Sequence, residues 1–176
     1  LSAGPLRVQV HAVGLNFADI FALTGLYSAT PEGAFIPGLE FAGTVIGTGS
    51  DTDNTDSAFQ IGDRVMGVTR FGGYCSIIDS EPDYLIPLPD DWSFAQGAAF
   101  PAQTLTAWYA LTTLGAIQPE QRVLIHSAAG GVGLQAMKLA TLLAANPVGT
   151  VSSPDKAAML QEMGFENVLV RQPDFS

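Results

Sequence analysis

The first half of the chain alternates apolar and polar residues in short runs, which glycine, proline and aspartate separate. This period of two is typical of half-buried antiparallel strands. We expect strands over residues 6–14, 41–49, 63–69 and 72–79. Between the first two, residues 16–25 space their apolar positions three and four apart, which predicts a short helix. Residues 1–95 are therefore expected to form a β-rich domain.

From residue 93 onward the period changes, and helices alternate with short apolar strands. Ser93 and Gln96 form a capping-box pattern before an alanine-rich helix that Pro101 interrupts. We expect helices over 105–115, 132–145 and 154–164, and strands over 122–126, 148–152 and 167–170. Nearly continuous apolar strands alternating with helices predict a buried parallel sheet in residues 96–176. The expected fold class is α/β plus β.

Three parallel strands make only half of a doubly wound dinucleotide-binding sheet. We therefore expect the chain to be part of a longer protein, and it begins with Leu1 rather than methionine.

Composition narrows the function classes. The net charge is −10, with seven lysines and arginines and no basic run, which argues against nucleic-acid binding. No apolar run reaches the length of about 20 residues that a membrane span needs. The aspartate-rich loop 49–60 departs from a calcium-binding loop at the required glycine and glutamate, so we expect a solvated loop.

A single cysteine excludes an internal disulfide, and with two histidines it makes a Cys/His zinc cage improbable. This usage fits a reducing compartment, and we expect a cytoplasmic protein, with an organelle left open by the non-methionine start. We assign His11, Cys75 and His126 to structural roles, with Cys75 in a strand and His126 as a satisfied core histidine.

The segment HSAAGGVG (126–133) stands between an expected strand and an expected helix. Ala128, Gly130 and Gly133 occupy the three glycine positions of a dinucleotide-binding loop. A side chain at the second position would block the backbone from a pyrophosphate, and the third position permits close packing of helix on strand. The free N–H groups of the first helical turn face the anion. The expected cofactor-binding residues are Ala129, Gly130, Gly131, Val132 and Gly133; the alternative is a purely structural turn.

The end of the next strand indicates which dinucleotide binds. It carries Ser152 and Ser153 in place of the carboxylate that an NAD site normally has, and Lys156 and Arg171 lie nearby in the expected fold. Hydroxyls and cations favour a 2′-phosphate, so these four residues predict NADPH. The alternative is that Lys156 is a solvated helix residue and Arg171 a charge at a strand end.

Several motifs together resemble one family. They are GLNFADIFALTGLY (14–27), IPGLEFAGTV (36–45), GDRVMGV (62–68), LTAWYAL (105–111) and HSAAGGVG (126–133). This order resembles the medium-chain dehydrogenase/reductase superfamily, and within it the zinc-free quinone oxidoreductase (zeta-crystallin-like) and enoyl reductase branch. The resemblance covers essentially the whole chain. It implies a GroES-like catalytic domain followed by a Rossmann domain, an active site in the cleft between them, and a homo-oligomer, for which we expect a dimer.

The resemblance also implies roles for single residues. Zinc-dependent relatives have a cysteine ligand where Asn16 stands and a histidine ligand where Leu39 stands, so no metal site is expected. Asn16 is the candidate that positions the nicotinamide ribose or the substrate, or it only caps the helix that follows it. Tyr27 is the candidate hydroxyl donor, or an aromatic residue that only packs in a turn. Thr106 matches a threonine near the nicotinamide, or it only bonds to a helical carbonyl.

Without a Lewis acid, an electrophilic acceptor is needed, which points to a quinone or an α,β-unsaturated carbonyl. Positioned donors would meet the charge that develops on its oxygen. The leading hypothesis is an NADPH-dependent, zinc-free reductase of such small molecules. Phe21 stands where quinone oxidoreductases often carry a tyrosine, so the rival hypothesis is an NADPH-binding regulatory or scaffolding protein with little turnover.

Overall fold

The computed structural model describes residues 5–48 and 58–172. The chain divides into two compact units, residues 1–102 and 103–176, and each is described by itself. Most of the aspartate-rich loop that was expected to be solvated, residues 49–57, lies outside the described residues.

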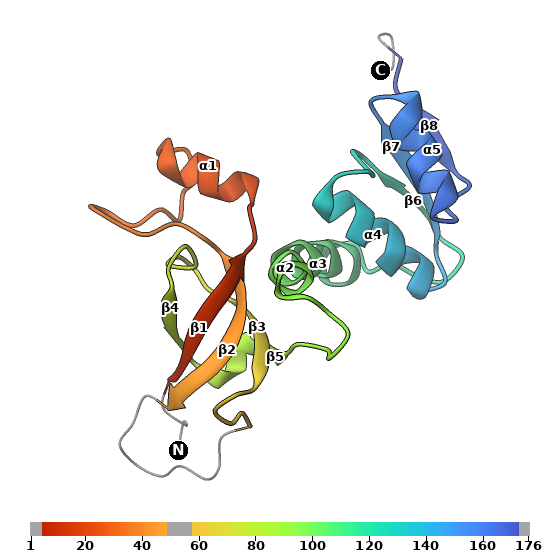
Figure 1. The fold of residues 1–176 in the computed structure, drawn as a ribbon. Coiled ribbons are helices and arrows are strands. Elements are labelled where there is room, and N and C mark those ends of the chain that lie inside the picture. The colour runs from red at the N-terminus through yellow and green to blue at the C-terminus, as the bar shows by residue number, and fades with distance from the viewer. Residues whose placement is uncertain (1–4, 49–57, 173–176) are drawn as a thin grey trace. The chain divides into compact units, whose positions relative to one another are not determined.

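The first unit is built on an antiparallel sheet of five strands in the order β4-β1-β2-β3-β5 (Figure 1). The strands are β1 (Leu6–Val13), β2 (Glu40–Thr48), β3 (Arg64–Val68), β4 (Ile77–Ser80) and β5 (Leu85–Pro87). Three short helices accompany them: α1 (Phe17–Leu23), η1 (Pro82–Tyr84) and α2 (Phe94–Ala98). Every strand pairing in this sheet is antiparallel, as the alternating pattern predicts.

The alternation along β1 explains how this sheet builds a core. Leu6 and Val8 point inward and are fully buried, while Arg7 between them is exposed. They join a cluster that includes Phe41 and Val65. The α2 helix packs against β1, β2 and β3. Its predicted capping box is confirmed, because Ser93 N donates to Gln96 Oε1 (2.8 Å) and Gln96 N donates to Ser93 Oγ (3.2 Å).

The second unit contains a parallel sheet in the order β6-β7-β8. Its elements are α3 (Pro101–Trp108), η2 (Tyr109–Leu114), β6 (Arg122–Ile125), α4 (Gly131–Leu142), β7 (Asn146–Val151), α5 (Pro154–Glu162) and β8 (Val168–Val170). The α4 helix packs on β6 and β7, and α5 packs on β7 and β8. Met137 and Leu160 bring the helices into one buried core with Val151 of β7. The parallel sheet confirms the expected α/β plus β class, with the first half of a Rossmann fold after a GroES-like sheet.

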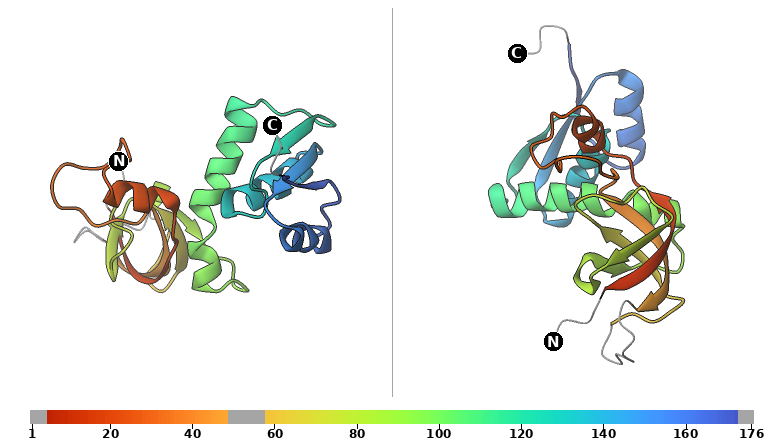
Figure 2. Two further views of the ribbon diagram at one scale, coloured as in Figure 1. Left: turned by 90° about the horizontal axis from the view of Figure 1, so that it is seen from above. Right: turned by 90° about the vertical axis from the view of Figure 1, so that its left-hand side faces the viewer.

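Three local expectations are wrong. The strand expected over 72–79 begins only at Ile77, because Gly72 adopts a φ of 98° and the chain turns there. Cys75 therefore lies in a turn and not in a strand. The helix expected to begin at residue 105 begins at Pro101, where the missing N–H of proline costs no helical hydrogen bond. It continues without a break into the π-helical segment η2, as Figure 2 shows.

Two glycines of β2 provide a test of the packing in the first unit. A Cβ added at Gly43 would lie 2.1 Å from the Gln9 carbonyl oxygen on β1, whereas one added at Gly47 would lie 3.8 Å from its nearest neighbour, Arg7 Cβ. We expect Gly43→Ala to lower the free energy of unfolding by about 1–3 kcal/mol, since the strands must separate locally. Gly47→Ala is the matched control and should change it by less than about 1 kcal/mol. Chemical denaturation measures both, and equal effects would contradict the packing described for β1 and β2.

Candidate functional site

The loop between β6 and α4 is held by backbone hydrogen bonds at its base. Ala128 N donates to Thr150 O (2.9 Å), and Gly130 N donates to Ser127 O (2.8 Å). Ser127 adopts a φ of 54° where the chain leaves the strand. Gly130 is the N-cap of α4, so the helix starts inside the glycine motif. The first N–H groups of a helix have no partner within it and form a site for an anion.

The three glycine positions of this loop differ in their surroundings. Ala128 is fully buried, and a Cβ added at Gly149 would lie 2.7 Å from its methyl group. That methyl group therefore faces the core, which explains how alanine is accepted there. A Cβ added at Gly133 would lie 2.3 Å from Ser127 O, so the fold itself requires this glycine. At Gly130 a Cβ would approach only Ser127 O, at 3.2 Å.

A small cavity of about 120 Å³ joins the loop to the ends of the neighbouring strands. It is lined by Ser127, Ala129, Gly130, Val151, Ser152, Lys156 and Arg171. Lys156 Nζ donates to Ser152 Oγ (3.2 Å). The cavity therefore brings together five of the residues that the sequence suggests for the cofactor. Ser153 is the N-cap of α5 and lies beside this group without lining it, as do Val132 and Gly133.

His126 differs from the expectation of a core histidine, because its side chain is exposed. Its Nδ1 lies 3.1 Å from the hydroxyl oxygen of the buried Thr150. The residue is satisfied by this hydrogen bond at the carboxyl end of β6, not by burial.

In the first unit, Asn16 lies immediately before α1 and is held at two points. Its backbone N donates to Asp19 Oδ2 (2.8 Å), and its side-chain Nδ2 donates to Glu40 Oε1 (2.9 Å). The second carboxylate oxygen of Glu40 accepts from Ala102 N (2.8 Å), in the first turn of α3. Asn16 thus occupies the N-cap position, while its amide group is directed to Glu40.

Two carboxylates are buried in this cluster. Asp19 also accepts from Gly38 N (3.2 Å) and from the Tyr74 hydroxyl (2.7 Å), so hydrogen bonds compensate for the burial of this carboxylate. Burial, followed by the hydrogen bond to Asp19, raises the pKa of Tyr74. Burial also raises the pKa of Glu40, and the N–H groups of Ala102 and Asn16 oppose that rise.

Sequence reasoning did not identify Glu40 or Tyr74. One signal for Glu40 was present: a single charged residue opens the apolar strand EFAGTV (40–45). Charged residues are almost never fully buried unless they are paired.

Tyr27, Thr106 and Phe21 are the other residues singled out in the sequence. The Tyr27 ring is half-buried and packs edge-on against Phe71, with ring centroids 6.4 Å apart. The packing role considered for Tyr27 is therefore present, whatever its hydroxyl does. Thr106 is exposed on α3, and Phe21 is exposed on α1.

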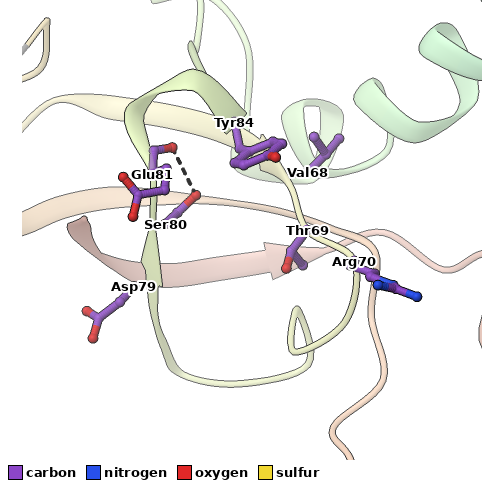
Figure 3. Close-up of a pocket in the computed structure, with 7 residues that line it drawn as sticks. All are labelled: Val68, Thr69, Arg70, Asp79, Ser80, Glu81 and Tyr84. Atoms are coloured by element: carbon purple, nitrogen blue, oxygen red, sulfur yellow. Dashed lines mark hydrogen bonds between the residues drawn. The ribbon is translucent and has the colours of Figure 1, made fainter. Parts of the chain in front are cut away.

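A larger cavity of about 500 Å³ in the first unit contains none of the predicted site residues (Figure 3). It is lined by Val68, Thr69, Arg70, Asp79, Ser80, Glu81 and Tyr84. Asp79 is paired with Arg7 on the sheet surface (2.7 Å). Because Arg7 neutralises Asp79, Glu81 and Arg70 remain as one acidic and one basic side chain of the lining, so its charge favours neither anions nor cations.

Within the described ranges, no helix is both long and apolar enough to cross a lipid bilayer. The same ranges contain no group of three or more histidine, cysteine, aspartate and glutamate side chains that could hold a metal ion.

Mutation can distinguish the roles of Gly130 and Gly133 in the loop. We expect Gly130→Ala to leave the unfolding temperature nearly unchanged and to weaken binding of the expected dinucleotide about tenfold or more, because the methyl group would stand where a phosphate approaches. Gly133→Ala should lower the unfolding temperature before any ligand is added, since its Cβ would overlap a carbonyl oxygen. Thermal unfolding and cofactor titration of the full-length protein measure both. If Gly130→Ala binds the dinucleotide as the unaltered protein does, the loop is structural.

The sequence from residue 2 to residue 110 matches the model of the alcohol dehydrogenase GroES-like domain. The phenolphthiocerol synthesis polyketide synthase type I Pks15/1 of Mycobacterium bovis is 41% identical over 169 residues, which are 95% of this chain and 7% of that protein.

Solved structures agree in fold. The CurK enoyl reductase has a TM-score of 0.86 at 35% identity, and the match covers 99% of this chain and 54% of that one. The Escherichia coli quinone oxidoreductase, solved in complex with NADPH, has a TM-score of 0.83 at 33% identity, covering 99% and 52%. The chain thus spans about half the length of these enzymes and a small part of the polyketide synthase. It belongs to the alcohol dehydrogenase GroES-like family, in the medium-chain dehydrogenase/reductase superfamily, and its structural neighbours include quinone oxidoreductases and enoyl reductases.

Proposed function

We propose that the protein containing this chain is an NADPH-dependent, zinc-independent reductase of an α,β-unsaturated carbonyl compound or a quinone. The observation that carries the proposal is the cavity in which the glycine loop meets Ser152, Lys156 and Arg171. The names of the relatives support it, since one is an enoyl reductase and another is a quinone oxidoreductase complexed with NADPH.

The residues of this cavity fit the two charged parts of NADPH. Lys156 and Arg171 would pair with the 2′-phosphate, and the hydroxyls of Ser152 and Ser153 would bond to it. The backbone N–H groups from Ala129 to Gly133 would face the pyrophosphate, with the positive end of the α4 dipole behind them. Asn16 and Thr106 would contact the nicotinamide end, as the family resemblance implies. When bound, NADPH supplies the hydride.

The other half of the reaction depends on hydrogen-bond donors. By the family resemblance, Asn16 and Leu39 stand where zinc-dependent relatives have a cysteine and a histidine ligand. This chain therefore lacks those two zinc ligands, and a zinc ion would not act as the Lewis acid there. An acceptor that is already conjugated to a carbonyl needs less activation. Tyr27 would donate a hydrogen bond from its phenolic hydroxyl to the developing oxyanion.

The similarity to the CurK enoyl reductase supports a conjugated double bond as the acceptor, and the similarity to the Escherichia coli quinone oxidoreductase supports a quinone. The family resemblance further suggests a homo-oligomer, with a dimer expected, that acts on a small molecule. The cysteine usage suggests a reducing compartment such as the cytoplasm.

Lys156 should decide between the two dinucleotides. We expect Lys156→Ala to weaken NADPH binding about tenfold or more and to leave NADH binding nearly unchanged, because a hydrogen bond to a charged group contributes about 1.5–3 kcal/mol. Fluorescence titration of the full-length protein measures both dissociation constants. Lys138→Ala, on the exposed side of α4, is the matched control. Equal losses for NADPH and NADH would show that the 2′-phosphate is held elsewhere.

The reaction itself is tested by stopped-flow oxidation of NADPH against a panel of enoyl thioesters, enones and quinones. We expect turnover with at least one of these classes and none with unactivated ketones. Tyr27→Phe keeps the ring beside Phe71 and removes the hydroxyl, so it should lower the turnover number about tenfold or more while NADPH affinity stays unchanged. Tight NADPH binding with no oxidation by any acceptor would replace the enzyme proposal with the regulatory one, which Phe21 favours.

A further inference from the structure

Glu40 is a fully buried carboxylate that neither the cofactor cavity nor the proposed hydrogen-bond donation by Tyr27 uses. It opens β2, and its backbone O accepts from Gly14 N (3.2 Å). A Cβ added at Gly14 would lie 2.2 Å from Glu40 Oε1, so the chain passes directly over this side chain. An ionisable group is enclosed this closely only when its hydrogen bonds are made inside the protein.

Both carboxylate oxygens have a donor. Oε1 accepts from Asn16 Nδ2 (2.9 Å), and Oε2 accepts from Ala102 N (2.8 Å). The second bond satisfies a backbone N–H at the start of α3, where the helix dipole also favours a negative charge. The first bond is made to a side chain that the reaction is proposed to use.

We propose that Glu40 is a positioning residue for Asn16. It holds the nitrogen of the Asn16 carboxamide toward its own carboxylate, so that the amide oxygen can accept a hydrogen bond from a ligand. The inference rests on the proposed function, in which Asn16 contacts the nicotinamide ribose or the substrate.

The physical reason lies in the chemistry of the two groups. A carboxamide that rotates by half a turn exchanges a donor for an acceptor, and the two ends have almost the same shape. An ionised carboxylate only accepts hydrogen bonds, so it admits the nitrogen end and rejects the oxygen end. A hydroxyl of the ribose or the substrate can then donate to Asn16 Oδ1.

The backbone of Asn16 is fixed separately. Its N–H donates to Asp19, which Gly38 and Tyr74 also hold. Loss of Glu40 therefore leaves the contacts with Asp19 in place and removes only the acceptor of the Asn16 side-chain nitrogen. This separation makes a positioning role distinguishable from a structural one.

Glu40→Gln tests the inference, because glutamine has the same size and can still accept from Ala102 N. Its NH₂ group then meets Asn16, whose amide should turn its oxygen inward and its nitrogen outward. We expect NADPH affinity or kcat/KM to fall about tenfold or more in the full-length protein, since an acceptor is replaced by a donor. Glu162→Gln, on the exposed end of α5, is the matched control and should change neither.

A double-mutant cycle with Asn16→Ala decides whether Glu40 acts through Asn16. In the Asn16→Ala background we expect Glu40→Gln to cause no further loss beyond about twofold. Additive losses would overturn the inference. Unchanged NADPH affinity and unchanged kcat/KM in Glu40→Gln would also overturn it. The cycle is measured on NADPH affinity as well as on turnover. A wild-type protein that binds NADPH without reducing any acceptor would contradict the proposed function, and the cycle on NADPH affinity would still test the inference about Glu40.

A second measurement does not require that Glu40→Gln folds. In the wild-type protein, the side-chain NH₂ signals of Asn16, assigned by their loss in Asn16→Ala, should show one proton that exchanges slowly with solvent. Rapid exchange of both protons would overturn the inference.

Discussion

The burial of Glu40 is the constraint on which the side-chain orientation of Asn16, a candidate catalytic residue of the first unit, depends. A carboxylate with no solvent contact has to take its hydrogen bonds from the protein, because an unpaired buried charge is strongly destabilising. Its donors come from the turn before α1 and from the first turn of α3. One buried group thereby ties the start of β2 to Asn16 and to the beginning of the helix that leads out of this unit. Burial, together with the negative charge of Asp19, raises the pKa of Glu40 against these two bonds.

A different constraint shapes the second unit: the closeness of α4 to the strand before it. Gly133 lies against the Ser127 carbonyl, and the methyl group of Ala128 lies against Gly149. These contacts leave no room for larger residues, and they aim the first turn of α4 at the cavity. Lys156 and Arg171 reach the same cavity from α5 and from the end of β8. Helix packing thus shapes the proposed anion site, and the proposed preference for NADPH over NADH depends on two exposed cations.

Periodicity predicts most of this fold, because the alternating and near-continuous apolar strands differ clearly in sequence. It fails where an element is too short to show a period, as in η1 and the three-residue strand β5. It also misplaced the start of α3, since proline ends one helix and begins another with equal ease. The glycine loop and its cations were predictable from local motifs. The role of Glu40 was not, because its two donors lie 24 and 62 residues away in the chain.

The central claim is that this chain builds a site for the 2′-phosphate of NADPH. Calorimetric titration of the full-length protein with adenosine 2′,5′-bisphosphate and with adenosine 5′-monophosphate tests it most directly, since the two ligands differ only in that phosphate. We expect adenosine 2′,5′-bisphosphate to bind about tenfold or more tightly than adenosine 5′-monophosphate. Added salt should reduce this difference in affinity. Equal affinities for the two ligands would contradict it.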